Sequence, residues 1–291
     1  MRRRMIFALT LGLGAAVAAR FWRASGQEPP QLGPLAAPTG PLKTYHLGHS
    51  LVGRDMPAML AQLAGQAYHS QLGWGASLKD HWQGTVNGFA EENAHPAHRL
   101  ARKALESGSY DAVILTEMVE LKDAIRYHDS ATMLANWANL ARKANPDVRL
   151  YLYETWHRLD DPAGWLTRID ADLAALWEYQ ILGPAIARSG PIYIIPAGQT
   201  LAAAVRLAEA GGLPGIPDRK AFFTDDIHLS DLGNWLVALT HYATLYHRPP
   251  TGLTRADGSL ATPLPPDTAR KLEELVWQTV SGYPLAGVSK G

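Results

Sequence analysis

Two segments far apart in the sequence carry the side chains of a serine-nucleophile reaction. Ser50 follows a short apolar segment in the order Gly48-His49-Ser50-Leu51, and Asp225 and His228 stand three residues apart near the other end of the chain. A serine hydroxyl is a poor nucleophile at neutral pH, and histidine is the base that most often accepts its proton. The imidazole in turn needs a carboxylate that fixes its tautomer. These residue types make Ser50, His228 and Asp225 a candidate triad.

Each segment has a second interpretation when it is taken alone. Serine is favoured at the N-cap of helices, so Ser50 can be a cap with no chemical role. The segment around Asp225 and His228 can be a polar loop before a helix, with a histidine on the surface. Asp226 is expected to point away from the triad or to cap the following helix. The catalytic interpretation gains its strength only when the two segments are considered together.

The elements that must position these residues alternate between strand and helix. Such alternation predicts parallel strands joined by right-handed crossovers, with helices on both faces of the sheet. The expected fold is therefore α/β, a flavodoxin-like three-layer sandwich around about five parallel strands. Ligands of such sheets bind beyond the carboxyl ends of the strands. Strands are predicted at 44–47, 68–72, 111–115, 148–153 and 192–195, of which 111–115 is a compact apolar run. Helices are predicted at 56–66, 96–107, 130–144, 165–187, 200–210, 232–246 and 268–280, with a kink or break near Pro184.

The arrangement of the two segments resembles the SGNH (GDSL-like) hydrolase superfamily. A nucleophile block follows the first predicted strand, and the run DDIHLSDLGNWLVA, which begins at Asp225, is similar to the final block of that family. The resemblance covers residues 42–248 and implies that Ser50 is the nucleophile, His228 the base and Asp225 its partner. The family usually has an acidic or amide residue before the serine. His49 stands there instead, and we expect it to be solvated or to contact substrate.

The same resemblance implies an oxyanion hole, which this sequence matches only in part. A glycine N–H is expected to join the Ser50 N–H, and Gly75 is the best match, with Gly73 as a second candidate. The family's asparagine donor is missing, because Thr116 and Glu117 follow the third predicted strand. Thr116 can donate a weaker hydrogen bond, and Glu117 can be protonated, orient a neighbour or bind substrate. The second side-chain donor stays unassigned.

Other polar and aromatic side chains follow the fourth and fifth predicted strands. Trp156 is a candidate platform for a sugar ring and Arg158 a candidate clamp for a carboxylate or sulfate, although a structural tryptophan is the more common case. Trp74 and Trp82 have the same ambiguity. The segment 213–218 is a candidate lid because of its proline and glycine content. We expect no metal and no cofactor, because the histidines are scattered and no glycine-rich phosphate loop is present.

The N-terminal segment predicts export. Three arginines precede an apolar stretch of about 14 residues, so residues 1–26 are expected to be a signal peptide, or a membrane anchor if they stay uncleaved. Residues 27–41 are a predicted linker and 42–291 a single catalytic domain. Without residues 1–26 the chain has 22 basic and 27 acidic residues, a net charge of −5, which suits a periplasmic or secreted protein and gives no basic face for nucleic acid. The absence of cysteine excludes disulfides and thiol nucleophiles.

Three functions agree with these features. The first is an esterase that cleaves carboxylic esters, including acetyl esters of carbohydrates, through an acyl-enzyme. The second is an acyltransferase that passes the acyl group to a sugar hydroxyl with the same triad. The third is a carbohydrate-binding protein on a hydrolase fold that has lost its activity, for which the missing asparagine is the best argument. The expected partner in each case is a small ester or a carbohydrate.

Overall fold

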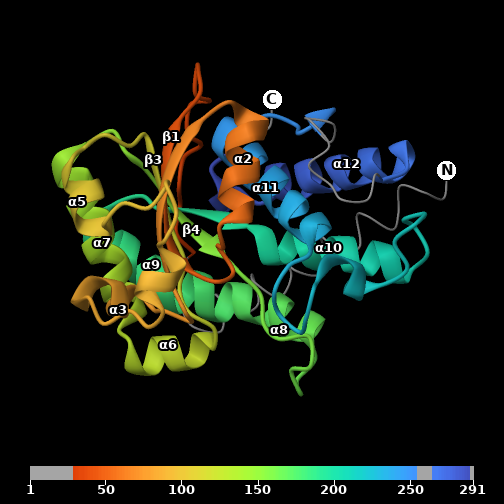
Figure 1. The fold of residues 1–291 in the computed structure, drawn as a ribbon, viewed down its shortest axis with the longest axis horizontal. Helices are drawn as coiled ribbons and strands as arrows, with labels where there is room; N and C mark the ends of the chain where they lie inside the picture. Colours follow the sequence, from red (N-terminus) through yellow and green to blue (C-terminus); the bar gives the residue numbers. More distant parts are fainter. Residues whose placement is uncertain (1–28, 254–263, 289–291) are drawn as a thin grey trace.

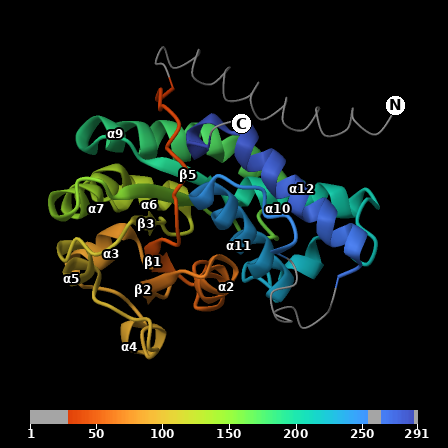
Figure 2. The same cartoon turned by 90° about the horizontal axis from the view of Figure 1, so that it is seen from above.

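The computed structural model describes residues 29–253 and 264–288 and has the expected α/β architecture. Five parallel strands form one sheet in the order β2-β1-β3-β4-β5, which is the flavodoxin-like order. Helices cover both faces of this sheet, as Figures 1 and 2 show. The predicted three-layer sandwich is therefore confirmed. The strands are β1 (Lys43–His49), β2 (Ala67–Gly73), β3 (Ala112–Leu115), β4 (Arg149–Glu154) and β5 (Tyr193–Pro196).

The helices divide between the two faces of the sheet. The described helical segments are α2 (Asp55–Ala64), α3 (Leu78–Gln83), α4 (Phe89–Glu92), α5 (Ala101–Glu106), α6 (Leu121–Tyr127), α7 (Ser130–Ala144), α8 (Trp165–Asp172), the π-helix η1 (Leu173–Leu182), α9 (Gly183–Ser189), α10 (Ala197–Glu209), the 3₁₀ turn η2 (Arg219–Phe222), α11 (Asp231–Tyr246), α12 (Pro266–Gly282) and the 3₁₀ turn η4 (Pro284–Ala286). Side chains of α2, α10, α11 and α12 share one hydrophobic core cluster. Those of α5, α7 and α9 belong to a second cluster on the opposite face. The two clusters fix which strand ends are left open to solvent.

The segment 96–107 does not form the single helix that its composition predicts. Only α5 is helical there, and the residues before it run beside the edge strand β2. The Ser70 N–H donates to the Ala97 carbonyl at 3.0 Å, and the Arg99 N–H donates to the Ser70 carbonyl at 3.1 Å. Pairing with an exposed strand edge satisfies these backbone groups as well as a helical turn would.

A further expectation is corrected. Residues 213–218 are no lid, since Leu213 and Ile216 are buried in the core and the Thr268 hydroxyl of α12 donates to the Pro214 carbonyl. The helix predicted at 165–187 was expected to kink or break near Pro184, and the structure divides it at this point. The π-helical segment η1 ends at Leu182, and α9 begins at Gly183 with Pro184 in its first turn.

The N-terminal expectations fall mostly outside the described residues. The predicted signal or anchor at 1–26 lies there entirely. Residues 29–41 contain no helix or strand, but Leu35 donates a backbone hydrogen bond to Gly287, so this stretch lies against the C-terminal part of the domain. Among the described residues, no helix has the length and apolar content that a membrane span requires.

Candidate active site

The structure brings Ser50, His228 and Asp225 together at the carboxyl end of the sheet. Ser50 directly follows β1, and the other two residues lie in the loop before α11. The Ser50 Oγ lies 3.0 Å from the His228 Nε2, and the His228 Nδ1 lies 2.7 Å from the Asp225 Oδ2. A ring that donates from Nδ1 to a carboxylate presents its unprotonated Nε2 to the serine hydroxyl. This is the geometry that general-base activation of a serine requires.

The loop that carries Asp225 is rigid because its own backbone binds the carboxylate. The Asp225 Oδ1 accepts hydrogen bonds from the N–H groups of Ile227 and His228 at 2.8 and 2.7 Å. The hydrogen bond from the His228 N–H contributes most to lowering the pKa of Asp225 to about 2, followed by those from the His228 ring and the Ile227 N–H. The carboxylate is therefore charged at any pH near neutrality. Gly233 lets α11 approach this loop, since a Cβ there would lie 2.2 Å from the Phe222 carbonyl.

A second loop, between β4 and α8, holds the triad loop from behind. The Trp156 Nε1 donates to the Ile227 carbonyl and the Leu159 N–H donates to the Asp226 carbonyl, both at 2.7 Å. Trp156 has 0% exposed surface, so the expectation of a sugar platform at this residue is wrong. Arg158 is exposed, but its guanidinium already binds the carboxylates of Asp160 and Asp226. The loop thus positions the triad, and a clamp for an anionic substrate at Arg158 has no support.

Two backbone N–H groups are free for an oxyanion. Within the part of the chain that the structure describes, neither the Ser50 N–H nor the Gly75 N–H donates a hydrogen bond. Gly75 is exposed and has a φ of 54°, a conformation that favours glycine. Gly73, the second candidate, is buried at the end of β2, with no room for a side chain beside Val86. These observations favour Gly75 as the partner of Ser50 in the oxyanion hole.

The two residues after β3 do not supply the missing donor. The Thr116 hydroxyl is buried and donates to the Tyr153 carbonyl at 2.7 Å, so it has no proton left for a substrate. The Glu117 side chain is also buried and accepts from the N–H groups of Leu78 and Met118. Both expectations for a direct role are therefore wrong. Glu117 instead fixes the start of α3, which follows Gly75 in the chain.

The nucleophile turn is fixed by two buried histidines. His49 is neither solvated nor free for substrate, since its Nε2 donates to the Glu117 carbonyl at 2.9 Å and its Nδ1 accepts from the Leu51 N–H. His81 donates from its Nε2 to the Gly48 carbonyl at 2.8 Å and accepts from the Gln71 side chain. Burial lowers the pKa of each imidazole to about 4, so both rings are neutral and act as fixed hydrogen-bond partners.

No protein-family model and no curated protein matches the chain.

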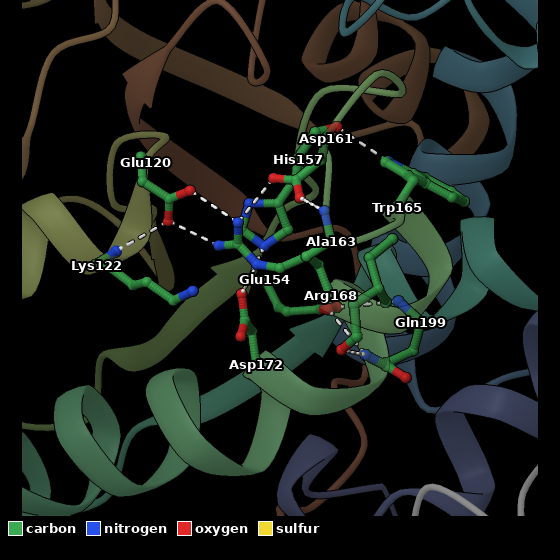
Figure 3. Close-up of polar contacts among 11 residues, drawn as sticks. Glu120, Lys122, Glu154, His157, Asp161, Ala163, Trp165, Arg168, Asp172 and Gln199 are labelled. Atoms are coloured by element: carbon green, nitrogen blue, oxygen red, sulfur yellow. Dashed lines mark hydrogen bonds and ion pairs between the residues drawn. The ribbon is translucent and has the colours of Figure 1, made fainter.

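A cluster of charged side chains that the sequence did not indicate supports the β4–α8 loop. Figure 3 shows Arg168 of α8 at its centre. The guanidinium binds Glu120 through both oxygens at 2.7 and 2.9 Å, and it reaches Asp161 and Asp172 at 2.7 Å each. The His157 Nε2 lies 2.9 Å from the same Asp172 oxygen that Arg168 binds. We refer to these five residues as the Arg168 cluster. It ties α8 and the residue before α6 to the loop that holds the triad.

Two buried carboxyl groups near the ends of β3 and β4 have raised pKa values. Burial raises the pKa of Glu117 to about 7 and that of Glu154 to about 8. Glu154 also accepts hydrogen bonds from the Gln199 backbone and side chain at 3.1 Å, so these two strand-end residues do meet. Gly198 allows this contact, because a Cβ there would lie 2.5 Å from the Glu154 carboxyl. Glu154, the last residue of β4, is therefore a neutral buried acid that lies against the start of α10.

This neutral acid makes stability depend on pH. Below the unfolded-state pKa of about 4.5 Glu154 is protonated in both states, and its favourable contribution is lost as the pH rises through about 8. Glu154→Gln is neutral at every pH, so we expect its melting temperature to fall less than that of the wild type between pH 5.5 and 9. Glu117 is present in both proteins, so its own pH-dependent contribution to stability is the same in each and cancels in the comparison. Thermal melts of wild type, Glu154→Gln and the exposed-site control Glu91→Gln test this, and parallel curves for all three would contradict it.

Proposed function

We propose that the protein is a serine hydrolase of the SGNH type that cleaves carboxylic esters. The observation that carries the proposal is the unbroken chain of contacts from the Ser50 hydroxyl through His228 to Asp225 at the carboxyl end of a parallel sheet. Ligands of such sheets bind at this edge. A lone surface histidine or a simple helix cap would not need a carboxylate bonded to the far side of the ring.

The proposed reaction has two steps. The Ser50 Oγ attacks the ester carbonyl carbon while its proton moves to the His228 Nε2, and the N–H groups of Ser50 and Gly75 bind the oxyanion. The tetrahedral intermediate expels the alcohol, which takes the proton from His228. A water molecule then gives its proton to His228 and attacks the acyl carbon, which releases the acid and regenerates Ser50. Asp225 stays ionised and stabilises the imidazolium in both steps.

The open position of the triad favours hydrolysis over acyl transfer. The side chains of His228 and Asp225 are about half exposed. Water can therefore reach the acyl-enzyme, whereas a transferase must exclude it. The same openness leaves space for a large alcohol such as a carbohydrate. The alternative of a non-catalytic binding protein does not explain why the three side chains keep hydrogen-bond distances.

Covalent labelling of Ser50 tests the proposal. A fluorophosphonate probe reacts with serines that a base activates, so we expect the wild type to be labelled and Ser50→Ala to be unlabelled. Ser109→Ala is the matched control, because this exposed serine bonds only to a backbone carbonyl of its own loop and lies far from the triad along the sheet. It should be labelled as the wild type is. Equal labelling of wild type and Ser50→Ala would remove Ser50 from the mechanism.

A further inference from the structure

Trp74 is an exposed tryptophan beside the proposed oxyanion hole. Of the residues that the structure describes, three large hydrophobic side chains are exposed, namely Trp74 at 55%, Leu100 at 44% and Tyr127 at 57%. A tryptophan usually buries most of its surface, because its ring contributes the largest apolar area of any side chain. Trp74 is followed directly by Gly75. Its exposure at this place therefore calls for a ligand.

The exposed ring is held in one orientation. The Trp74 Nε1 donates to the Glu92 Oε1 at 2.8 Å, and the Trp74 N–H donates to the Asn87 carbonyl at 2.8 Å. One face of the indole packs on the backbone of Gly88, where a Cβ would lie 2.2 Å from the ring atom Cδ2. The hydrogen bond to Glu92 and the packing on Gly88 thus fix a ring that leaves more than half of its surface exposed. A rigid aromatic surface binds a ligand with little loss of conformational entropy.

The register of the sheet places the Trp74 backbone beside that of Ser50. His49 of β1 pairs with Gly73 of β2, and both strands run in the same direction. Ser50 and Trp74 follow these two residues directly, so their backbones leave the sheet at neighbouring strand ends, which are about 5 Å apart in such sheets. A substrate that extends along this edge of the sheet can therefore contact both residues.

We propose that Trp74 is the platform on which a sugar ring of the substrate stacks, an inference that rests on the proposed esterase function. The C–H groups on one face of a pyranose pack on a flat indole, while its hydroxyls need polar partners at the rim. Glu92 supplies a carboxylate at that rim, 2.8 Å from the indole Nε1. A protein partner or a lipid surface requires a contiguous apolar patch, whereas the two printed contacts of this ring are the Glu92 carboxylate and Gly88, and the other exposed large hydrophobic side chains of the described residues, Leu100 and Tyr127, lie on other elements. The ligand class is therefore a carbohydrate ester.

A comparison of two esters tests the platform. Glucose pentaacetate offers a pyranose to the indole, whereas 4-nitrophenyl acetate carries the same acyl group without a sugar. Trp74→Ala is expected to raise KM for the sugar ester about tenfold and to change kcat/KM for 4-nitrophenyl acetate less than twofold. Trp74→Phe should lie between, because it keeps a ring but loses the bond to Glu92. Leu100→Ala, which removes an exposed apolar side chain elsewhere, should leave the kinetic constants for both esters unchanged. If Trp74→Ala lowers kcat/KM equally for both esters, or for neither, the proposal is overturned.

Binding without turnover separates this proposal from the function on which it rests. Ser50→Ala cannot form an acyl-enzyme, so acetylated xylo-oligosaccharides can be titrated against it by calorimetry. We expect binding that the additional change Trp74→Ala weakens about tenfold, even if fluorophosphonate labelling has failed and the esterase function is wrong. Absence of binding, or equal binding by both variants, would refute the platform. If sedimentation shows a wild-type dimer that Trp74→Ala dissociates, the ring contacts a second copy of the chain, and the platform proposal is overturned.

Discussion

Replacing His228 with alanine is expected to lower kcat/KM for ester hydrolysis by at least about 10⁴-fold. The His228 Nε2 lies 3.0 Å from the Ser50 Oγ, and no other side chain bonds to that hydroxyl among the described residues. The free N–H groups of Ser50 and Gly75 should leave a residual rate above that of water. Steady-state turnover of 4-nitrophenyl acetate measures the effect, and a loss below tenfold would count against the triad.

Two adjacent aspartates provide a matched control for the same mechanism. Asp225→Asn keeps the shape of the side chain but loses the charge that holds the Nδ1 proton, so we expect a loss of about 10⁴-fold. Asp226→Asn changes the neighbouring residue, whose carboxylate bonds to Arg158 at the surface. It should alter kcat/KM by no more than a few-fold. Similar losses in the two variants would show that the loop as a whole, rather than one carboxylate, is needed.

The sheet could be predicted because strands and helices alternate along the chain. Three of the strands contain short apolar runs, and all five strands were expected within two residues of their bounds in the structure. The triad was predicted from the resemblance of its two segments to the SGNH blocks, together with the expected position of both at the carboxyl ends of parallel strands. Ser50 and His228 are 178 residues apart, but each lies next to the carboxyl end of the sheet. The short helices α3, α4 and α6 were not predicted, since 4 to 7 residues are too few for a periodic pattern.

The roles of single side chains were harder to predict, because burial is a property of the tertiary structure. Trp156 and Trp74 both follow strands, and nothing in their neighbourhoods shows that the first is enclosed and the second exposed. Thr116 lies where the resemblance implies an oxyanion donor, yet its hydroxyl donates its hydrogen bond to the Tyr153 carbonyl of the neighbouring strand β4. His49 has the residue type of a surface or catalytic group, but it is a neutral buried one. A single sequence carries no signal for these outcomes.

The Arg168 cluster is the clearest feature that the sequence did not reveal, and its loss should have a large effect on stability. Arg168→Met keeps much of the apolar volume but leaves Glu120, Asp161 and Asp172 without their shared cation. Removing one partner of a buried ion pair costs about 3–5 kcal/mol, because the remaining charges stay desolvated. The Arg168 side chain is 8% exposed, so little water can replace it. We therefore expect Arg168→Met to lower the free energy of unfolding by an amount in that range at pH 7.

The pH dependence of this loss distinguishes lost charge from lost packing. Hydrogen bonds from Arg168 lower the pKa of Glu120 to about 2, so the cluster stabilises the fold at neutral pH and loses this contribution as the pH falls through about 2. The difference between wild type and Arg168→Met should therefore shrink from pH 7 to pH 3. Urea unfolding at both values measures it. Arg206→Met breaks the more exposed pair with Asp170 and should cost at most about 1 kcal/mol.

The cluster also connects stability to the proposed chemistry. Asp161 and His157 belong to the loop whose Trp156 and Leu159 bind the carbonyls beside His228. If the cluster positions that loop, folded Arg168→Met should show a lower kcat with little change in KM, because substrate contacts are intact while the imidazole is less well placed. If Arg168→Met instead proves as stable as Arg206→Met and keeps the wild-type kcat, the loop holds the triad without help from α8. In that case the hydrogen bonds of Trp156 and Leu159 alone would suffice to fix the catalytic loop.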